Sequence, residues 1–153
     1  MRVGIISDTH GLLRPEALLA LQGVALILHA GDVGAQEILA RLKEIAPVFA
    51  VRGNVDTQEW AKELPVTAAV EINGVSFYLL HNLQHLDLKP EAAGFRVVVS
   101  GHTHQAEQYE KDGVLYLNPG SAGPRRFSLP VTLAILDVAK EPMRAEISVL
   151  LQA

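Results

Sequence analysis

Runs of consecutive apolar residues alternate with amphipathic stretches in the first third of the chain. Apolar runs cover 2–7, 25–30 and 47–53 and predict three strands. The run over 2–7 is continuous, as expected for a strand covered on both faces, and 25–30 is interpreted as the next buried strand. Between them, Pro15 begins a helical pattern in PEALLALQ, and 35–46 places its apolar residues on one helical face. The order strand, helix, strand, helix, strand predicts a parallel sheet with helices packed on it.

The second half of the chain has a different pattern, in which pairs of strand-like segments flank short turns. Asn73-Gly74 and Asp112-Gly113 each separate two such segments, which is a strong hairpin signal. A last pair of apolar segments flanks Pro142. This half predicts mostly antiparallel strands. With no repeat or linker in the sequence, we expect one domain over 1–153 built from two packed sheets.

Composition and charge exclude several classes of function. The 153 residues contain 13 Lys and Arg against 17 Asp and Glu, a formal charge of −4, so there is no general footprint for nucleic acid or an anionic membrane. There is no cysteine, which excludes disulfides and thiolate metal sites. No signal peptide or membrane-spanning run is recognisable, and we expect a cytoplasmic protein.

Polar side chains follow the predicted strands at the points where they end. In open α/β sheets, ligand sites lie at the carboxyl ends of the strands, so these side chains are expected to meet. Carboxylate, amide and imidazole ligands suit Mn²⁺, Fe²⁺, Zn²⁺ or Ni²⁺. The candidate ligands are Asp8 and His10 in SDTH, Asp32 in HAGD, Asn54 in RGN, His81 in LLHN, and His102 and His104 in GHTH.

Each motif alone has an ordinary explanation. A single histidine after a strand is usually a surface or hydrogen-bonded residue, and G-N is often only a turn. Gly31, Gly53 and Gly101 each precede a candidate ligand, which indicates backbone with positive φ or close approach. Because five segments in order supply the same ligand chemistry, the combination favours one metal site.

The ordered set DTH (8–10), GD (31–32), GN (53–54), His81 and GHTH (101–104) resembles the calcineurin-like metallophosphoesterase superfamily. NPGS (118–121) is similar to the small bacterial and archaeal phosphodiesterase-like branch. The resemblance extends over essentially the whole chain. It implies an α/β fold, a four-layer α/β/β/α sandwich of two mixed β-sheets flanked by helices.

The resemblance also implies two divalent metal ions, for which Mn²⁺ is the first choice and Ni²⁺, Fe²⁺ or Zn²⁺ are alternatives. The expected reaction is hydrolysis of a phosphate diester by a hydroxide that bridges the ions, positioned with the phosphate by Asp32, Asn54 and His102. One ion would be held by Asp8, His10, Asp32 and His104, and the other by Asp32, Asn54, His81 and His102, with Asp32 bridging both.

Several neighbouring residues complete the sequence prediction. Many superfamily members have a histidine that contacts phosphate or protonates the leaving group where this chain has Val55. Asp56 is expected to orient a ligand histidine, and Arg125 to contact phosphate, with an exposed turn as the alternative for Arg125. His29 is expected to be structural, and His85 a solvated loop residue rather than an acid.

Other functions stay open at this stage. A phosphomonoesterase or nucleotide pyrophosphatase would use the same ligands. The retromer subunit of eukaryotes, a protein-interaction scaffold with an eroded ligand set, represents a different class. Every ligand position is intact here, which favours an enzyme acting on a small phosphate ester. A homodimer or higher homo-oligomer is also expected from apolar hairpin edges and from the resemblance.

Overall fold

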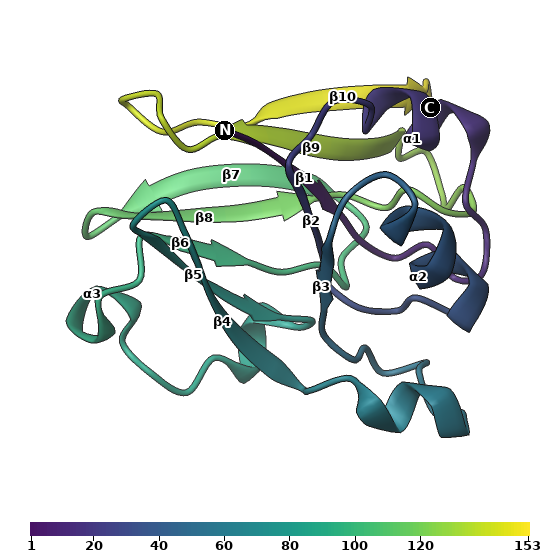
Figure 1. Cartoon of the computed structure of the whole chain (residues 1–153), viewed down its shortest axis with the longest axis horizontal. Coiled ribbons are helices and arrows are strands. Elements are labelled where there is room, and N and C mark those ends of the chain that lie inside the picture. Colours follow the sequence, from purple (N-terminus) through teal and green to yellow (C-terminus); the bar gives the residue numbers. More distant parts are fainter.

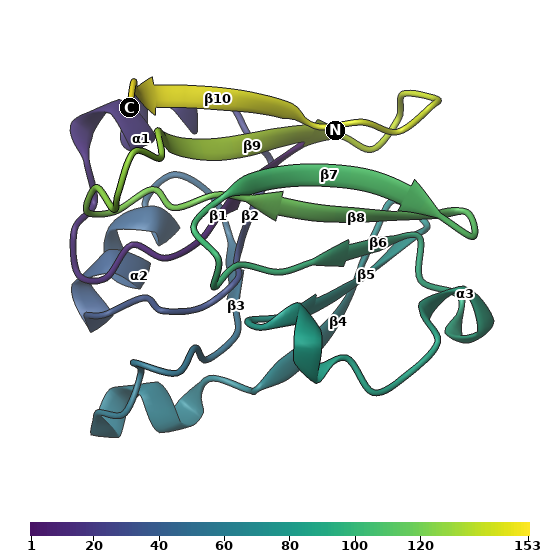
Figure 2. The same cartoon turned by 180° about the vertical axis from the view of Figure 1, so that it is seen from behind.

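Two five-stranded sheets packed face to face form the centre of the molecule (Figures 1 and 2). The computed structural model describes residues 1–153. In the first sheet, β1, β2 and β3 are parallel as predicted, and the final hairpin of β9 and β10 adds to β1 in antiparallel orientation. The order across this sheet is β10 (Glu146–Leu151), β9 (Val131–Asp137), β1 (Arg2–Ile6), β2 (Leu26–His29) and β3 (Val48–Ala50).

The second sheet is mixed, which confirms the fold expected from the resemblance, although the pattern of the second half did not indicate its parallel pairs. The two predicted hairpins are present, but β5 pairs with β6 and β6 with β8 in parallel. The chain crosses over from β5 to β6, and the hairpin of β7 and β8 then folds back so that its second strand lies beside β6. The order is β4 (Thr67–Ile72), β5 (Val75–Leu80), β6 (Val97–Val99), β8 (Val114–Pro119) and β7 (Ala106–Lys111).

Helices and turns cover the outer faces and complete the four-layer sandwich. Apolar side chains of α1 and α2 pack on the first sheet, around Ile6 and Ile27. The segment that contains η2 and α3 covers the second sheet, so this fourth layer is thin. No helix has the length and apolar character needed to cross a membrane. The helical elements are α1 (Pro15–Ala20), α2 (Gln36–Lys43), η1 (Glu59–Glu63), η2 (Leu83–His85) and α3 (Pro90–Ala93).

The main core lies between the two sheets. Ile5 and Leu28 of the first sheet share a fully buried cluster with Phe77, Leu79 and Val99 of the second. Burying one such side chain contributes about 1.5–3 kcal/mol, so this layer fixes the two sheets against each other. As a result, the loops at their carboxyl ends have defined relative positions.

Backbone hydrogen bonds join these loops to one another. The N–H of Asp8 donates to the carbonyl of Gly31 (3.0 Å), and the N–H of His10 donates to the carbonyl of Asp32 (2.9 Å). In the second sheet, the N–H of Gly101 donates to the carbonyl of His81 (2.9 Å). The segments that carry the candidate ligands are therefore anchored to each other.

Candidate metal centre

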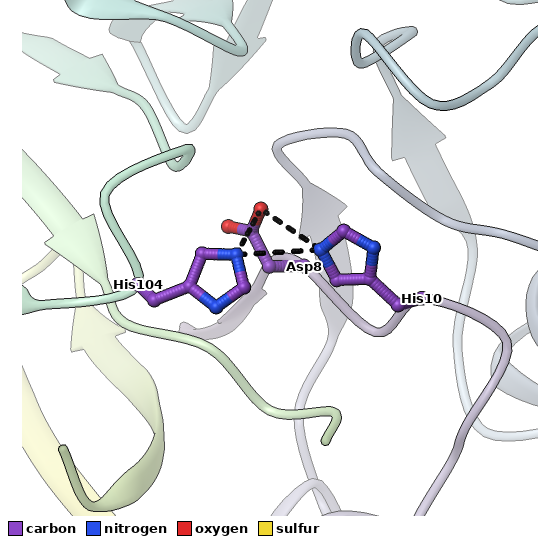
Figure 3. Close-up of side chains that lie close together, drawn as sticks. All are labelled: Asp8, His10 and His104. Atoms are coloured by element: carbon purple, nitrogen blue, oxygen red, sulfur yellow. Dashed lines mark hydrogen bonds and ion pairs between the residues drawn. The ribbon is translucent and has the colours of Figure 1, made fainter. Parts of the chain in front are cut away.

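Side chains from both sheets meet where the strands end. They are the side chains of His10, which is half-buried, and of four buried residues, Asp8, Asp32, His81 and His104. Figure 3 shows His10 and His104 on opposite sides of Asp8, the first on the loop after β1 and the second on the loop after β6. The side chains form two overlapping groups with ligand atoms within 4.8 Å of one another: Asp8, His10 and His104 in one, and Asp8, Asp32 and His81 in the other.

The two carboxylate oxygens of Asp8 have different surroundings. Oδ2 accepts hydrogen bonds from the Ser7 hydroxyl (2.7 Å) and the His102 backbone N–H (3.1 Å). Oδ1 is buried and accepts no hydrogen bond. Oδ1 instead faces three imidazole Nε2 atoms, those of His104 (3.4 Å), His10 (3.7 Å) and His81 (3.8 Å).

The two carboxylate oxygens of Asp32 differ in the same way. Its Oδ1 accepts from the Val55 backbone N–H (3.0 Å), and its Oδ2 lies 3.1 Å from His81 Nε2 and 3.6 Å from His10 Nε2. Asp8 is the residue common to both groups, whereas the sequence predicts Asp32 as the shared ligand. Because Asp32 approaches an imidazole of each group, both carboxylates are placed between the same two histidines.

The tautomer of His81 tests whether these residues fit a cation. Its Nδ1 lies 2.8 Å from the carbonyl oxygen of Ala30, which can only accept, so Nδ1 carries a proton and donates. In the neutral ring, the lone pair of Nε2 then points at the free oxygens of Asp8 and Asp32, and Nε2 is buried without a hydrogen-bond partner. Three electron-rich atoms facing one another fit a divalent ion.

The pKa shifts show how strongly this cluster attracts positive charge. Burial opposes ionisation of Asp32, yet the adjacent His81 imidazole and the hydrogen bond from the Val55 N–H hold its pKa at about 2. Burial acts on Asp8 in the same way, and interactions with His10 and His81 still lower its pKa. Burial would lower the pKa of His81, but Asp32 and Asp8 raise it. The carboxylates therefore stay ionised and draw a proton onto His81.

The backbone at the cluster adopts an unusual conformation. Non-glycine residues seldom have positive φ, and such strain collects at functional sites. Here the candidate ligands themselves carry it: Asp8 (56°), His10 (46°), Asp32 (56°), His102 (74°) and His104 (66°). The backbone hydrogen bonds between the loops and the packing of the two sheets hold these residues in this conformation.

Gly53 and Gly101 are needed for close approach, one of the two reasons the sequence indicated. A Cβ on Gly53 would overlap the backbone nitrogen and Oδ1 of Asp32. A Cβ on Gly101 would overlap the Ser7 hydroxyl and Asp8 Oδ2. The end of β6 can therefore reach the end of β1 only without a side chain at 101.

Asp56 has a different role from the one predicted, because it orients no histidine. Its buried carboxylate accepts three backbone N–H groups, from Val33 (3.2 Å), Gly34 (3.0 Å) and Gly53 (2.9 Å). These donors belong to the loops that carry Asp32 and Asn54. Asp56 therefore ties two ligand-bearing loops together through their backbones.

His29 is structural, as the sequence predicts. It is fully buried; its Nδ1 accepts the Gly31 N–H (3.1 Å), so its Nε2 carries the proton and donates to Thr9 Oγ1 (3.0 Å). The Thr9 hydroxyl donates in turn to the Val33 carbonyl (2.8 Å). This chain of hydrogen bonds requires a neutral ring, and burial lowers the pKa of His29 to about 4.

We expect His29 to make the metal-free protein less stable in mild acid. Between about pH 4 and 6.5 the His29 ring is protonated in the unfolded chain but neutral in the folded protein. The free energy of unfolding therefore decreases by about 3 kcal/mol as the pH is lowered from about 6.5 to 4. Urea denaturation in EDTA at pH 7 and pH 4 would compare the natural protein with His29→Gln. The difference in the free energy of unfolding between the natural protein and His29→Gln should shrink towards pH 4. If the free energies of the two proteins changed in parallel with pH, this assignment would be contradicted.

A cleft of about 780 Å³ opens beside the cluster. His81 lies at its wall, and the exposed Asn54 and His102 line it as well, so these two predicted ligands lie on the open side of the site. The His102 ring stands edge-on to that of His81, with centroids 5.2 Å apart. The structure thus brings all seven predicted ligands to one junction, five packed together and two on the cleft.

Arg52 is a cleft residue that sequence reasoning missed as a site residue. It is half-buried, lines the same cleft as Asn54, and its guanidinium forms no hydrogen bond or ion pair within the chain. Such a group suits a phosphate oxygen. Its position directly before Gly53 and the candidate ligand Asn54 is the sequence feature that could have identified it.

Arg125 does not join the cluster. It is exposed, and its guanidinium donates to the carbonyl oxygen of Gln152. The charge of its neighbour Arg126 does reach the site: burial, Arg126 and His10 together lower the pKa of His104. Val55 contributes its backbone N–H to Asp32 and exposes its side chain.

Comparison with known proteins shows similarity to phosphoesterases. The calcineurin-like phosphoesterase superfamily domain matches residues 1–141. A probable metallophosphoesterase of Methanothermobacter thermautotrophicus is 37% identical, with 96% of this chain and 91% of the relative covered. The structure of an archaeal phosphodiesterase has a TM-score of 0.79 at 28% identity, covering 97% of this chain and all (100%) of the other.

A further structural neighbour has a different kind of name. Vps29 from Chaetomium thermophilum superimposes with a TM-score of 0.77 at 18% identity, covering 97% of this chain and 94% of that protein. At this identity the likeness shows a shared fold alone. The domain match and the archaeal relatives establish more: this chain belongs to the calcineurin-like phosphoesterase superfamily.

Proposed function

We propose that this protein hydrolyses phosphate diesters at a pair of divalent metal ions. The observation that carries the proposal is a pair of buried atoms without hydrogen-bond partners, Asp8 Oδ1 and His81 Nε2, which lie together with the Asp32 carboxylate at the edge of an open cleft. The structurally similar archaeal protein at 28% identity is a phosphodiesterase. When bound, two divalent ions activate a shared water and neutralise phosphate charge.

The chain's own residues have separate tasks in this proposal. We assign one ion to Asp8, His10, Asp32 and His104, and the other to Asp32, Asn54, His81 and His102. Asn54, His81 and His102 of the second set line the cleft, so a phosphate ester would enter from that side. Arg52, free of partners in the same cleft, would then bind a non-bridging phosphate oxygen and hold the ester for attack.

Charge supports binding of an anion here although the chain as a whole is acidic. The two carboxylates of the cluster cannot balance the four positive charges of two divalent ions. With Arg52 beside it, the loaded site is therefore strongly positive. A local field of this kind attracts phosphate esters in spite of a net formal charge of −4.

We expect metal-stripped protein to regain diester hydrolysis on addition of a suitable divalent ion. The measurement is turnover of bis-p-nitrophenyl phosphate with Mn²⁺, Ni²⁺, Zn²⁺ or Mg²⁺, beside p-nitrophenyl phosphate as the monoester. Activity should follow metal content, vanish with chelator and return with the ion.

Other outcomes would favour the alternative functions. Preference for the monoester would indicate a phosphomonoesterase. Absence of turnover in protein that binds both ions would favour a binding protein of the retromer-subunit kind. Either result would overturn the phosphodiesterase proposal.

A further inference from the structure

The proposed reaction has a further chemical requirement, which is a proton for the leaving group. When the bond between phosphorus and the leaving oxygen breaks, the electron pair stays on that oxygen. An alkoxide or phenoxide leaves faster when a positioned acid gives it a proton, typically by 10²–10⁴-fold. The residue that supplies this proton must line the cleft and must not be a metal ligand.

The six histidines can be sorted by their surroundings. Four of them, His10, His81, His102 and His104, belong to the proposed ligand set. His29 is fully buried with both ring nitrogens hydrogen-bonded. The remaining one is His85, whose side chain is exposed and lines the same cleft as His81 and His102.

Other polar residues of the cleft are poorer proton donors at neutral pH. Arg52, Asp87 and Tyr78 also line the cleft. In general, guanidinium groups do not lose their proton in proteins, and carboxyl groups are ordinarily ionised. Phenols are much weaker acids than an imidazolium. Histidine is the side chain whose ordinary pKa lies near neutrality.

The turn that carries His85 is held in place from two sides. It is a single 3₁₀ turn, Leu83–His85, in which the side chain of Asn82 accepts the Gln84 N–H (3.0 Å). Leu83 and Leu86 pack on the outer face of the second sheet. The turn follows directly after His81, whose ring is fixed on the Ala30 carbonyl.

We propose that His85 is the general acid that protonates the leaving group during diester hydrolysis; this inference rests on the proposed function. Hydroxide adds to phosphorus as the bond to the leaving oxygen breaks, and that oxygen takes a proton from the His85 imidazolium. The products are a phosphate monoester, an alcohol or phenol, and neutral His85. The sequence favours a solvated loop residue at this position, but in the structure the residue lines the same cleft as His81 and His102.

The test is the dependence of rate on the leaving group. Methyl phosphate diesters of 2,4-dinitrophenol, p-nitrophenol and phenol need increasing help from an acid. In His85→Asn we expect kcat/KM for the phenyl ester to fall by about 10²-fold or more, and that for the dinitrophenyl ester to change little. Added imidazole should restore part of the phenyl-ester rate. Gln84→Ala, on the same turn, is the matched control and should behave like the natural protein.

Melting temperature and metal content, measured on both variants, would show that fold and site are intact. An equal loss for all three esters would overturn the inference and make His85 a positioning residue. No loss for any ester would overturn it as well and leave His85 a solvated loop residue. If the natural protein cleaved none of these diesters with any metal, the proposed function itself would fail.

Discussion

Asp32→Asn is expected to abolish metal-dependent diester hydrolysis while the protein stays folded. The amide keeps the size of the carboxylate and can still accept the Val55 N–H. It removes the charged Oδ2 that lies 3.1 Å from His81 Nε2 and 3.6 Å from His10 Nε2. Loss of such a charge from a buried site should lower kcat/KM by about 10³-fold or more, which leaves no detectable cleavage.

Three measurements would separate the possible causes. Metal content by mass spectrometry should fall, circular dichroism should be unchanged, and bis-p-nitrophenyl phosphate should no longer be cleaved. Asp112→Asn is the matched control, because it makes the same chemical change in the β7–β8 turn, where Asn is well tolerated. If Asp32→Asn kept both metal and activity, Asp8 would be the essential carboxylate of the site.

Asp56→Ala is expected to cause the largest loss of stability. It would leave three backbone N–H groups without their acceptor, those of Val33, Gly34 and Gly53. An unsatisfied buried donor costs about 1–3 kcal/mol, and partial access of water reduces the sum, so we expect a loss of about 3–5 kcal/mol. Metal affinity should fall too, because the loops that carry Asp32 and Asn54 lose their common anchor.

The size of this effect can be tested with graded variants. Asp56→Asn keeps one acceptor oxygen, which can serve Val33 and Gly53, but turns an amide N–H towards Gly34. Its loss in urea denaturation should lie between those of the natural protein and Asp56→Ala. The exposed neighbour Thr57→Ala is the control. A loss below about 1 kcal/mol for Asp56→Ala would show that water replaces the carboxylate.

Local patterns predicted the elements because their causes are local. Continuous apolar runs became β1 and β2, which are buried on both faces, and Asn73-Gly74 and Asp112-Gly113 form the turns of two hairpins with positive φ at every turn residue. The arrangement of the second sheet was not predictable in this way. Parallel pairing of β6 with β5 and β8 depends on a crossover and a returning hairpin, which no short pattern encodes.

By itself, the sequence determined which residues could bind metal, since ligand chemistry belongs to the residue type and strand ends bring such residues to one edge. Only the tertiary structure decided what each neighbouring residue does. Asp56 binds three amides of other loops, Arg125 binds a distant carbonyl, and His85 lies in the cleft. These roles depend on contacts between segments far apart in the chain, and packing of the two sheets sets those contacts.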